Sequence, residues 1–159
     1  MAPKNQRWWL TQDSESVLID APAERIYDLV ADMPRMGEWS PECTGGRWVV
    51  PATGPAVGAK FEGDNIVKIG PITLKRWTTT SEITDYAPNE VFGFVAEGYT
   101  SWRYEFRDHD GATSVTESFS HKPHEGWQKF VYDTVARRSN AMVKGMQQTL
   151  TRMKETLEH

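Results

Sequence analysis

The final part of the sequence carries apolar side chains at helical spacing. Residues 127–156 contain no proline, and at about 100° per residue their apolar positions fall on one side of a helix. The positions on this side are Val131, Val135, Met142, Met146, Leu150 and Met153. The opposite side is mainly charged or polar. The pattern predicts one long helix whose apolar side packs across a sheet.

Upstream, between residues 44 and 122, the pattern changes to short apolar and β-branched runs separated by turn residues. The runs cover residues 47–50, 59–69, 72–86, 91–97, 101–107 and 113–121. Their separators include Gly70-Pro71, Gly98 and the Asp-His-Asp-Gly segment at 108–111, which are typical of hairpin turns. Six consecutive runs with short connections predict an antiparallel meander, because parallel strands need longer crossovers.

Before the meander, residues 15–20 predict a first strand, and a helix start follows it. We expect Asp20 or Ala21 near the N-cap and Pro22 near the first helical position. Pro34 is expected to break this helix, and residues 36–39 to form a second short helix. The predicted fold is α+β: a curved antiparallel sheet of about six or seven strands wrapped around a long C-terminal helix, with two short helices after strand one.

The chain of 159 residues is long enough for one domain, which we place at residues 1–156. Residues 1–12 are expected to be an N-terminal extension or an extra strand. Leu157-Glu158-His159 resembles the start of a vector-encoded polyhistidine tag. A flat sheet would suffice to bury the helix, whereas a strongly bent sheet would leave a cavity beside it.

Charge and cysteine content narrow the function classes. The net charge is -4 and the sequence has no basic block, which argues against a nucleic-acid partner. The mean hydropathy is -0.60, and no apolar run has the length of a membrane span. Cys43 is the only cysteine, so an internal disulfide is excluded, and a reducing cytoplasm is the expected location.

Aromatic residues make up 11% of the sequence, which would suit a wide apolar pocket as well as a core. Strand alternation places several of them on one face, which we expect to point toward the helix. These inward residues are Phe92, Phe94, Trp102, Tyr104, Phe106 and Phe119.

The same alternation places Glu117 on the apolar face of the last strand. A lone buried carboxylate is costly, so Glu117 needs a partner or a wet cavity. Arg138 lies about 40° from Met142 on the helix, so we expect it to face the same cavity. One interpretation is a structural ion pair or a carboxylate at a wet rim, and the other is a polar anchor for a ligand's carbonyl or hydroxyl.

Other kinds of site find little support. His121 and His124 lack the spacing of a metal-binding helix, no Cys-x-x-Cys pair exists, and no nucleophile elbow surrounds a serine. We therefore expect no metal and no cofactor. If the protein is an enzyme, general acid–base groups would have to come from Glu117, Tyr104, Arg138 and His121.

Four segments resemble the START-like (SRPBCC, or helix-grip) superfamily, most closely its polyketide cyclase/dehydrase-like branch. They are residues 19–32, 39–42, 100–117 and 140–150. The resemblance implies the helix-grip fold and inward positions for Gly63, Asn65 and Trp77. It also implies that residues 39–42 close one end of the grip, although Ser-Pro commonly marks turns and the pattern at Ser40-Pro41 favours a simple helix stop.

The leading function hypothesis is binding or transport of a hydrophobic, lipid- or polyketide-like molecule in an internal cavity. The alternatives are a polyketide aromatase/cyclase and a co-chaperone-like interaction protein, the latter working through Trp8-Trp9. The expected state is a monomer or homodimer. The predicted ligand-binding residues are Trp39, Phe61, Asn65, Trp77, Phe92, Phe94, Trp102, Tyr104, Glu117, Phe119, Arg138 and Met142.

Overall fold

The computed structural model describes residues 12–41, 43–121 and 138–158. Along the chain these residues form β1 (Gln12–Ile19), α1 (Ala23–Ala31), the 3₁₀ helix η2 (Met33–Glu38), β2 (Cys43–Trp48), β3 (Lys60–Ile69), β4 (Ile72–Ala87), β5 (Val91–Ala96), β6 (Thr100–His109), β7 (Ala112–His121) and α3 (Arg138–Glu158).

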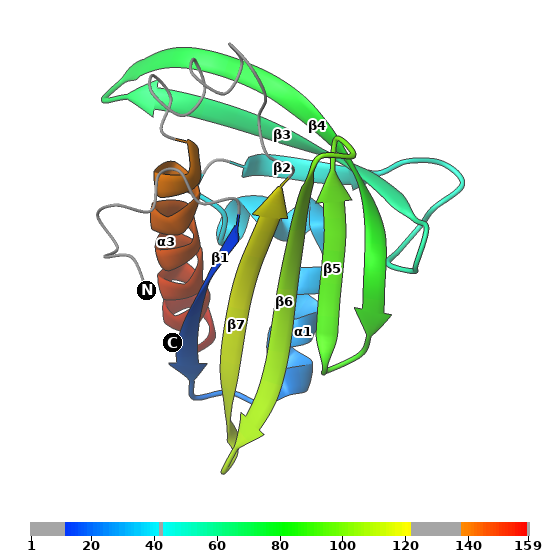
Figure 1. Cartoon of the computed structure of the whole chain (residues 1–159), viewed down its shortest axis with the longest axis vertical. Helices are drawn as coiled ribbons and strands as arrows, with labels where there is room; N and C mark the ends of the chain where they lie inside the picture. The colour runs from blue at the N-terminus through cyan, green and yellow to red at the C-terminus, as the bar shows by residue number, and fades with distance from the viewer. Residues whose placement is uncertain (1–11, 42, 122–137, 159) are drawn as a thin grey trace.

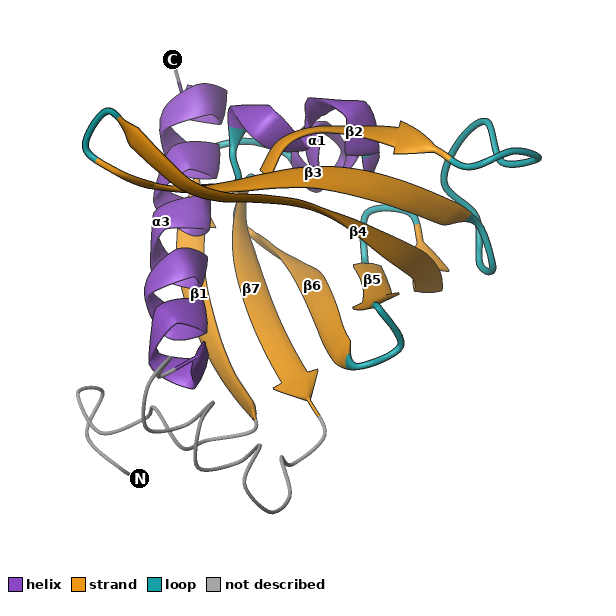
Figure 2. Ribbon diagram, turned by 90° about the horizontal axis from the view of Figure 1, so that it is seen from above, coloured by secondary structure: helices purple, strands orange, loops and turns teal. Residues whose placement is uncertain are grey.

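Within the described residues the strands form one seven-stranded antiparallel sheet in the order β1-β7-β6-β5-β4-β3-β2. The predicted meander from β2 to β7 is confirmed, and β1 pairs with the last strand. The sheet bends so that β2, β3 and β4 run across the direction of β1, β7 and β6 (Figures 1 and 2). Helix α3 lies against β1 and β7 inside this bend, which confirms the predicted α+β helix-grip fold.

Burial along β7 follows the predicted alternation. The side chains of Thr113, Val115, Glu117, Phe119 and His121 are all buried, and those between them are not. The pleat sends successive side chains to opposite faces, so a strand with one buried face must show this period of two. The polar face of β7 therefore points away from α3, as the sequence predicts.

The core joins the inner face of the sheet to α1 and α3. Helix α1 contributes Ile26, Leu29 and Val30. Helix α3 contributes Met146, Leu150 and Met153, each at most 3% exposed, which confirms the described part of its apolar side. Val131 and Val135 lie outside the described residues, as does the Met142 side chain.

The start of α1 differs from the prediction. Pro22 is the N-cap residue, and no side chain caps the helix. The backbone before it is held by β7, because the Thr113 hydroxyl donates to the Ala21 carbonyl at 2.8 Å. Helix α1 ends at Ala31, before Pro34, as predicted, but η2 begins earlier than the predicted 36–39, with Pro34 in its first turn, where the missing N–H needs no partner.

Two strand boundaries also differ. The sequence predicts a strand at 47–50, whereas β2 covers Cys43–Trp48 and Val50 is 89% exposed. The glycines at 45 and 46 conceal this strand, because glycine has low β-propensity. The predicted turn at 108–111 is shorter: β6 continues through His109, and Asp110 and Gly111 alone have the positive φ values, 54° and 90°, that a two-residue hairpin turn requires.

Gly46 is required in β2 because η2 packs directly on it. A Cβ added to Gly46 would lie 2.6 Å from the Met33 carbonyl oxygen, whereas one added to Gly45 would meet no atom within 4 Å. We expect Gly46→Ala to lower the free energy of unfolding by about 1–3 kcal/mol, the usual cost of overpacking. Gly45→Ala is the matched control, and equal urea midpoints for the two variants would contradict this interpretation.

Of the C-terminal residues set aside as tag-like, Leu157 and Glu158 belong to the last turn of α3, and His159 lies outside the described residues. Leu157 is 6% exposed within the core, and Glu158 accepts hydrogen bonds from the Asp20 backbone N–H and from Lys154. Their origin in a tag stays a prediction. Trp8 and Trp9 lie outside the described residues. None of the helices that the structure describes has the length and apolar character needed to span a membrane.

Candidate functional site

A cavity of about 510 Å³ lies between the bent sheet, η2 and α3. Many of its walls are aromatic. Of the aromatic residues predicted from the sequence, those lining it are Trp39, Phe61, Trp77, Phe94, Trp102 and Tyr104. Asn65 and Glu117, both also predicted, contribute polar groups to the same cavity. The alternation of β3, β4, β5, β6 and β7 thus brings seven of the predicted side chains to one place, and the end of η2 adds Trp39 as the eighth.

Four predicted residues lie elsewhere or cannot be placed. Phe92 is fully buried and packs on the rings of Tyr27 and Phe94, outside the cavity lining. Phe119 packs with Met146 and Trp102 and is likewise outside the lining. The side chains of Arg138 and Met142 lie outside the described part of the structure, so their predicted roles stay predictions.

Glu117 and Tyr104 form a buried pair in the lining of the cavity. They are directly opposite in the β6–β7 register, and each is at most 3% exposed. The Tyr104 hydroxyl donates to Glu117 Oε1 at 2.8 Å. Glu117 Oε2 is buried and has no hydrogen-bond partner among the described residues. Glu117 thus has one partner, a phenol from the neighbouring strand, and its predicted pairing with Arg138 stays a prediction.

Burial controls the protonation of both groups. It raises the pKa of Glu117 from its ordinary value of 4.5 to about 8, and the Tyr104 hydrogen bond opposes this rise only in part. Burial and the neighbouring Glu117 also raise the pKa of Tyr104 well above its ordinary value. At neutral pH Glu117 is therefore mostly a neutral acid.

Trp39 adds a second unpaired polar atom to the lining. It directly follows η2, is 1% exposed, and meets the Tyr104 ring edge to face at 6.1 Å between centroids. Its indole Nε1 is buried without an acceptor among the described residues. Ser40 and Pro41 also line the cavity, so the segment after η2 both ends that helix and forms a wall.

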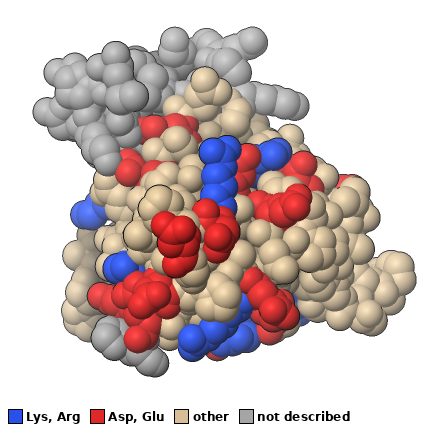
Figure 3. Space-filling view, turned by 90° about the horizontal axis from the view of Figure 1, so that it is seen from below, with Lys and Arg blue, Asp and Glu red and all other residues tan. Residues whose placement is uncertain are grey.

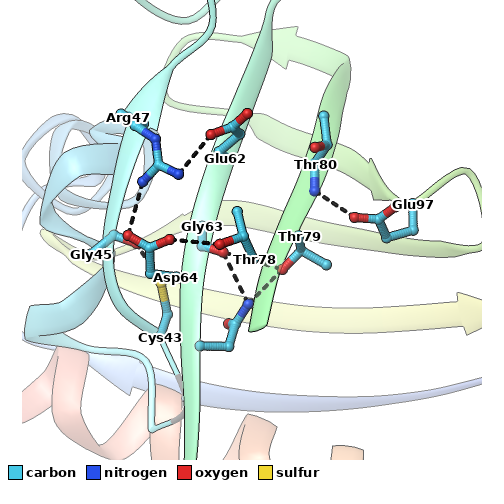
Figure 4. A network of polar contacts seen from close by, with 11 residues as sticks. Cys43, Gly45, Arg47, Glu62, Gly63, Asp64, Thr78, Thr79, Thr80 and Glu97 are labelled. Atoms are coloured by element: carbon cyan, nitrogen blue, oxygen red, sulfur yellow. Dashed lines mark hydrogen bonds and ion pairs between the residues drawn. The ribbon is translucent and has the colours of Figure 1, made fainter. Parts of the chain in front are cut away.

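Polar side chains on β2, β3 and β4 bind one another and hold the wall of the cavity that β3 and β4 form. The Asn65 amide donates to Thr79 Oγ1 at 2.5 Å and to the Gly63 carbonyl at 3.1 Å. On the outer side, Arg47 bridges Glu62 and Asp64. Figure 4 shows these contacts joining β2, β3 and β4. Both amide hydrogens of Asn65 serve the sheet, so Asn65 shapes the wall more than it offers donors to a ligand.

Sequence reasoning missed two parts of the lining. Gly145 and Thr149 face the cavity from α3, and Tyr99 and Thr100 do so from the β5–β6 connection. Gly145 had a signal, because it is the only glycine in the helical segment and leaves a gap one turn before Thr149. The sequence gives no such signal for the connection between β5 and β6, since the position of that connection depends on the bend of the sheet.

Two further reactive groups of the cavity lining, His121 and Cys43, also make contacts within the fold. His121 is 7% exposed and stacks between the rings of Tyr99 and Phe119. The Cys43 thiol donates to the Gly45 carbonyl at 3.1 Å, and burial raises its pKa, which keeps it protonated. Among the described residues, no cluster of His, Cys, Asp or Glu side chains could hold a metal ion.

Comparisons with known proteins agree with this geometry. A solution structure of a polyketide-cyclase-like protein from Corynebacterium glutamicum has 32% sequence identity, covering 93% of this chain and 91% of that protein, with a TM-score of 0.64. A crystal structure of a Chromobacterium violaceum protein has 13% identity over 94% of this chain and 99% of that chain, with a TM-score of 0.69.

A third solved structure comes from a biosynthetic locus. It is a protein of the dynemicin locus, 14% identical over 94% of this chain and 48% of that chain, with a TM-score of 0.63. At such identities the last two likenesses show the fold alone. A comparison with curated proteins finds no match. The family model described as polyketide cyclase/dehydrase and lipid transport matches residues 12–158, and the chain therefore belongs to that family.

Proposed function

We propose that the protein binds a hydrophobic small molecule, lipid- or polyketide-like, in the cavity beside α3. The observation that carries this proposal is an aromatic cavity whose lining includes Glu117 and Trp39, because Glu117 Oε2 and Trp39 Nε1 are buried and have no hydrogen-bond partner in the part of the chain that the structure describes. Such atoms are rare in folded proteins, because each loses its hydrogen bonds to water without replacement. A ligand in the cavity would supply the missing partner.

The size and chemistry of the cavity support a ligand of drug-like dimensions. Its volume of about 510 Å³ is within the range of roughly 300–1,000 Å³ that small-molecule sites occupy. The aromatic walls would contact an apolar body. The indole N–H and the protonated carboxyl of Glu117 would donate to an acceptor such as a carbonyl oxygen, which makes this end of the cavity specific for that group.

Gly145 offers a way to fill the cavity without disturbing the fold. A Cβ added there meets no atom within 4 Å, and the residue lines the cavity from α3. We expect Gly145→Leu to weaken binding of the apolar dye anilinonaphthalene sulfonate by about tenfold or more, because the leucine occupies ligand space. Gly145→Ala is the matched control: it should raise stability by about 1 kcal/mol and largely preserve dye binding.

Native mass spectrometry of the wild-type protein and both variants completes the test. A bound apolar molecule should appear as added mass in the wild-type protein and in Gly145→Ala, but not in Gly145→Leu. Equal dye affinity and equal added mass in all three proteins would place the ligand outside this cavity and contradict the proposal.

The Tyr104–Glu117 pair favours a second candidate, a cyclase or dehydratase acting by general acid–base catalysis. A carboxyl group with a pKa of about 8 can donate a proton near neutral pH and accept it back. Glu117 lines the cavity, its Oε2 has no hydrogen-bond partner among the described residues, and Tyr104 would hold the carboxyl in place. The masses of a recovered ligand decide between the candidates: loss of one water on incubation would support the enzyme, and an unchanged ligand the carrier.

A further inference from the structure

The β3–β4 hairpin ends in a ribbon that is exposed on both faces. All ten residues from 67 to 76 are exposed, although they remain paired as strands around Gly70-Pro71. In Figures 1 and 2 this end of the hairpin projects beyond α3, away from the rest of the sheet. We call residues 67–76 the hairpin tip.

Apolar side chains gather on the hairpin tip. Ile69 and Ile72 are direct partners across the turn, and they are 66% and 63% exposed. Val67 and Leu74 are exposed beside them. Together they are four of the seven large exposed apolar residues in the described parts of the chain. Clustered apolar surface of this kind marks an interaction site, whereas single exposed apolar residues do not.

The charges of the hairpin tip are of one sign. Lys68, Lys75 and Arg76 lie within it, with no acid, although the whole chain has a net charge of -4. By contrast, the face viewed from below Figure 1 carries several groups of acidic side chains interspersed with basic ones (Figure 3). The tip thus combines an apolar end with basic flanks. That pairing matches an anionic lipid surface, where apolar groups enter the interface and cations meet the headgroups.

The hairpin tip also adjoins the cavity. The Lys75 ammonium lies 5.3 Å from the centre of the Trp77 ring, and Trp77 and Thr78 line the cavity. A tryptophan at this place would lie at the depth where such residues gather in membranes, between the headgroups and the chains. A surface bound at the tip would therefore be next to one wall of the binding site.

We propose that the hairpin tip docks the protein on lipid surfaces that carry anionic headgroups. A second copy of the chain fits less well, because tip-to-tip contact would bring six cations together without an acid from either tip. The proposal goes beyond ligand binding in the cavity, and the two can fail separately, since one is measured with vesicles and the other with a soluble dye.

The test is cosedimentation of the full chain with vesicles of phosphatidylcholine alone or mixed with phosphatidylglycerol. We expect binding to the mixed vesicles that weakens as salt is raised. The double variant Ile69→Ser/Ile72→Ser should bind at least about tenfold more weakly, because it removes two large apolar groups. Lys68→Gln/Lys75→Gln should lose the preference for phosphatidylglycerol.

Val50→Ser/Val57→Ser is the matched control, because these valines are 89% and 66% exposed in the connection between β2 and β3. It should bind like the wild-type protein. Circular dichroism and dye binding show that each variant keeps its fold and cavity. Equal vesicle binding by all variants, or none by the wild-type protein, would overturn the proposal. So would a wild-type dimer in light scattering that the Ile69→Ser/Ile72→Ser variant dissociates.

Discussion

The Glu117→Gln variant is expected to gain stability over the wild-type protein as the pH rises from about 5 to about 9. In the wild-type protein the pKa of Glu117 is raised from 4.5 to about 8 by burial. Between these values the folded state holds a proton that the unfolded state has released, so stability falls as the pH rises. At roughly 1.4 kcal/mol per pKa unit, the total is on the order of 5 kcal/mol.

Glutamine imitates the neutral acid that the fold prefers. Its amide oxygen can accept from Tyr104 as Glu117 Oε1 does, and its NH₂ replaces the protonated Oε2. The variant and the wild-type protein should therefore have similar stabilities near pH 5, where Glu117 is neutral in the folded state. Above about pH 8 the wild-type protein must bury a charge, and the variant need not.

Urea unfolding at a series of pH values measures the free energy of unfolding of each protein. Titrating groups other than Glu117 contribute equally to both proteins, so their effects cancel in the difference. Glu105→Gln is the control, because Glu105 is a partly exposed carboxylate one residue from Tyr104 on β6. Its stability should run parallel to that of the wild-type protein. Parallel curves for Glu117→Gln as well would mean that Glu117 is not a buried neutral acid.

Phe92→Ala is expected to lower the free energy of unfolding by about 3–5 kcal/mol, the usual cost of emptying a buried phenylalanine site. Phe92 is fully buried, and its ring meets those of Tyr27 and Phe94 at 6.2 Å each. Since a domain of this size has a total stability of about 5–15 kcal/mol, the variant should be close to unfolding at room temperature.

Chemical denaturation followed by tryptophan fluorescence measures this loss. Ile72→Ala is the control, because Ile72 is 63% exposed on the hairpin tip and its truncation should change stability by less than about 0.5 kcal/mol. If the free energy of unfolding fell no further in Phe92→Ala than in Ile72→Ala, Phe92 could not be at the centre of the packed core. A loss of ligand binding without a loss of stability would instead return Phe92 to the ligand-binding set.

The position of Glu117 shows what the alternation of residues within one strand can predict. Alternation along 113–121 predicts that Glu117 shares a face with Val115 and Phe119, and all three are buried. The same reasoning places Trp102 and Tyr104 on the inner face of β6. It works because the period of a strand is set by its own backbone, whatever the partner strand is.

Failures occur where a distant contact decides local structure. Helix α1 begins at Ala23, after a segment whose Ala21 carbonyl accepts a hydrogen bond from Thr113 of β7, a contact that the local sequence does not show. Strand β2 includes Gly46 because η2 approaches so closely that a side chain would meet the Met33 carbonyl. Phe92 and Phe94 alternate alike, yet Phe94 alone of the two reaches the cavity, because the bend of the sheet separates their surroundings.

By itself, the sequence determined the order of the elements, the inward faces of β5, β6 and β7 and the apolar side of α3, because these depend on periods of two and of about 3.6 residues within single segments. Only the tertiary structure decided what those faces meet. The β6–β7 register placed the Tyr104 hydroxyl on Glu117, and the turn after η2 placed the Trp39 indole beside them. Such pairings depend on the register between strands and on the bend of the whole sheet, which no single segment encodes.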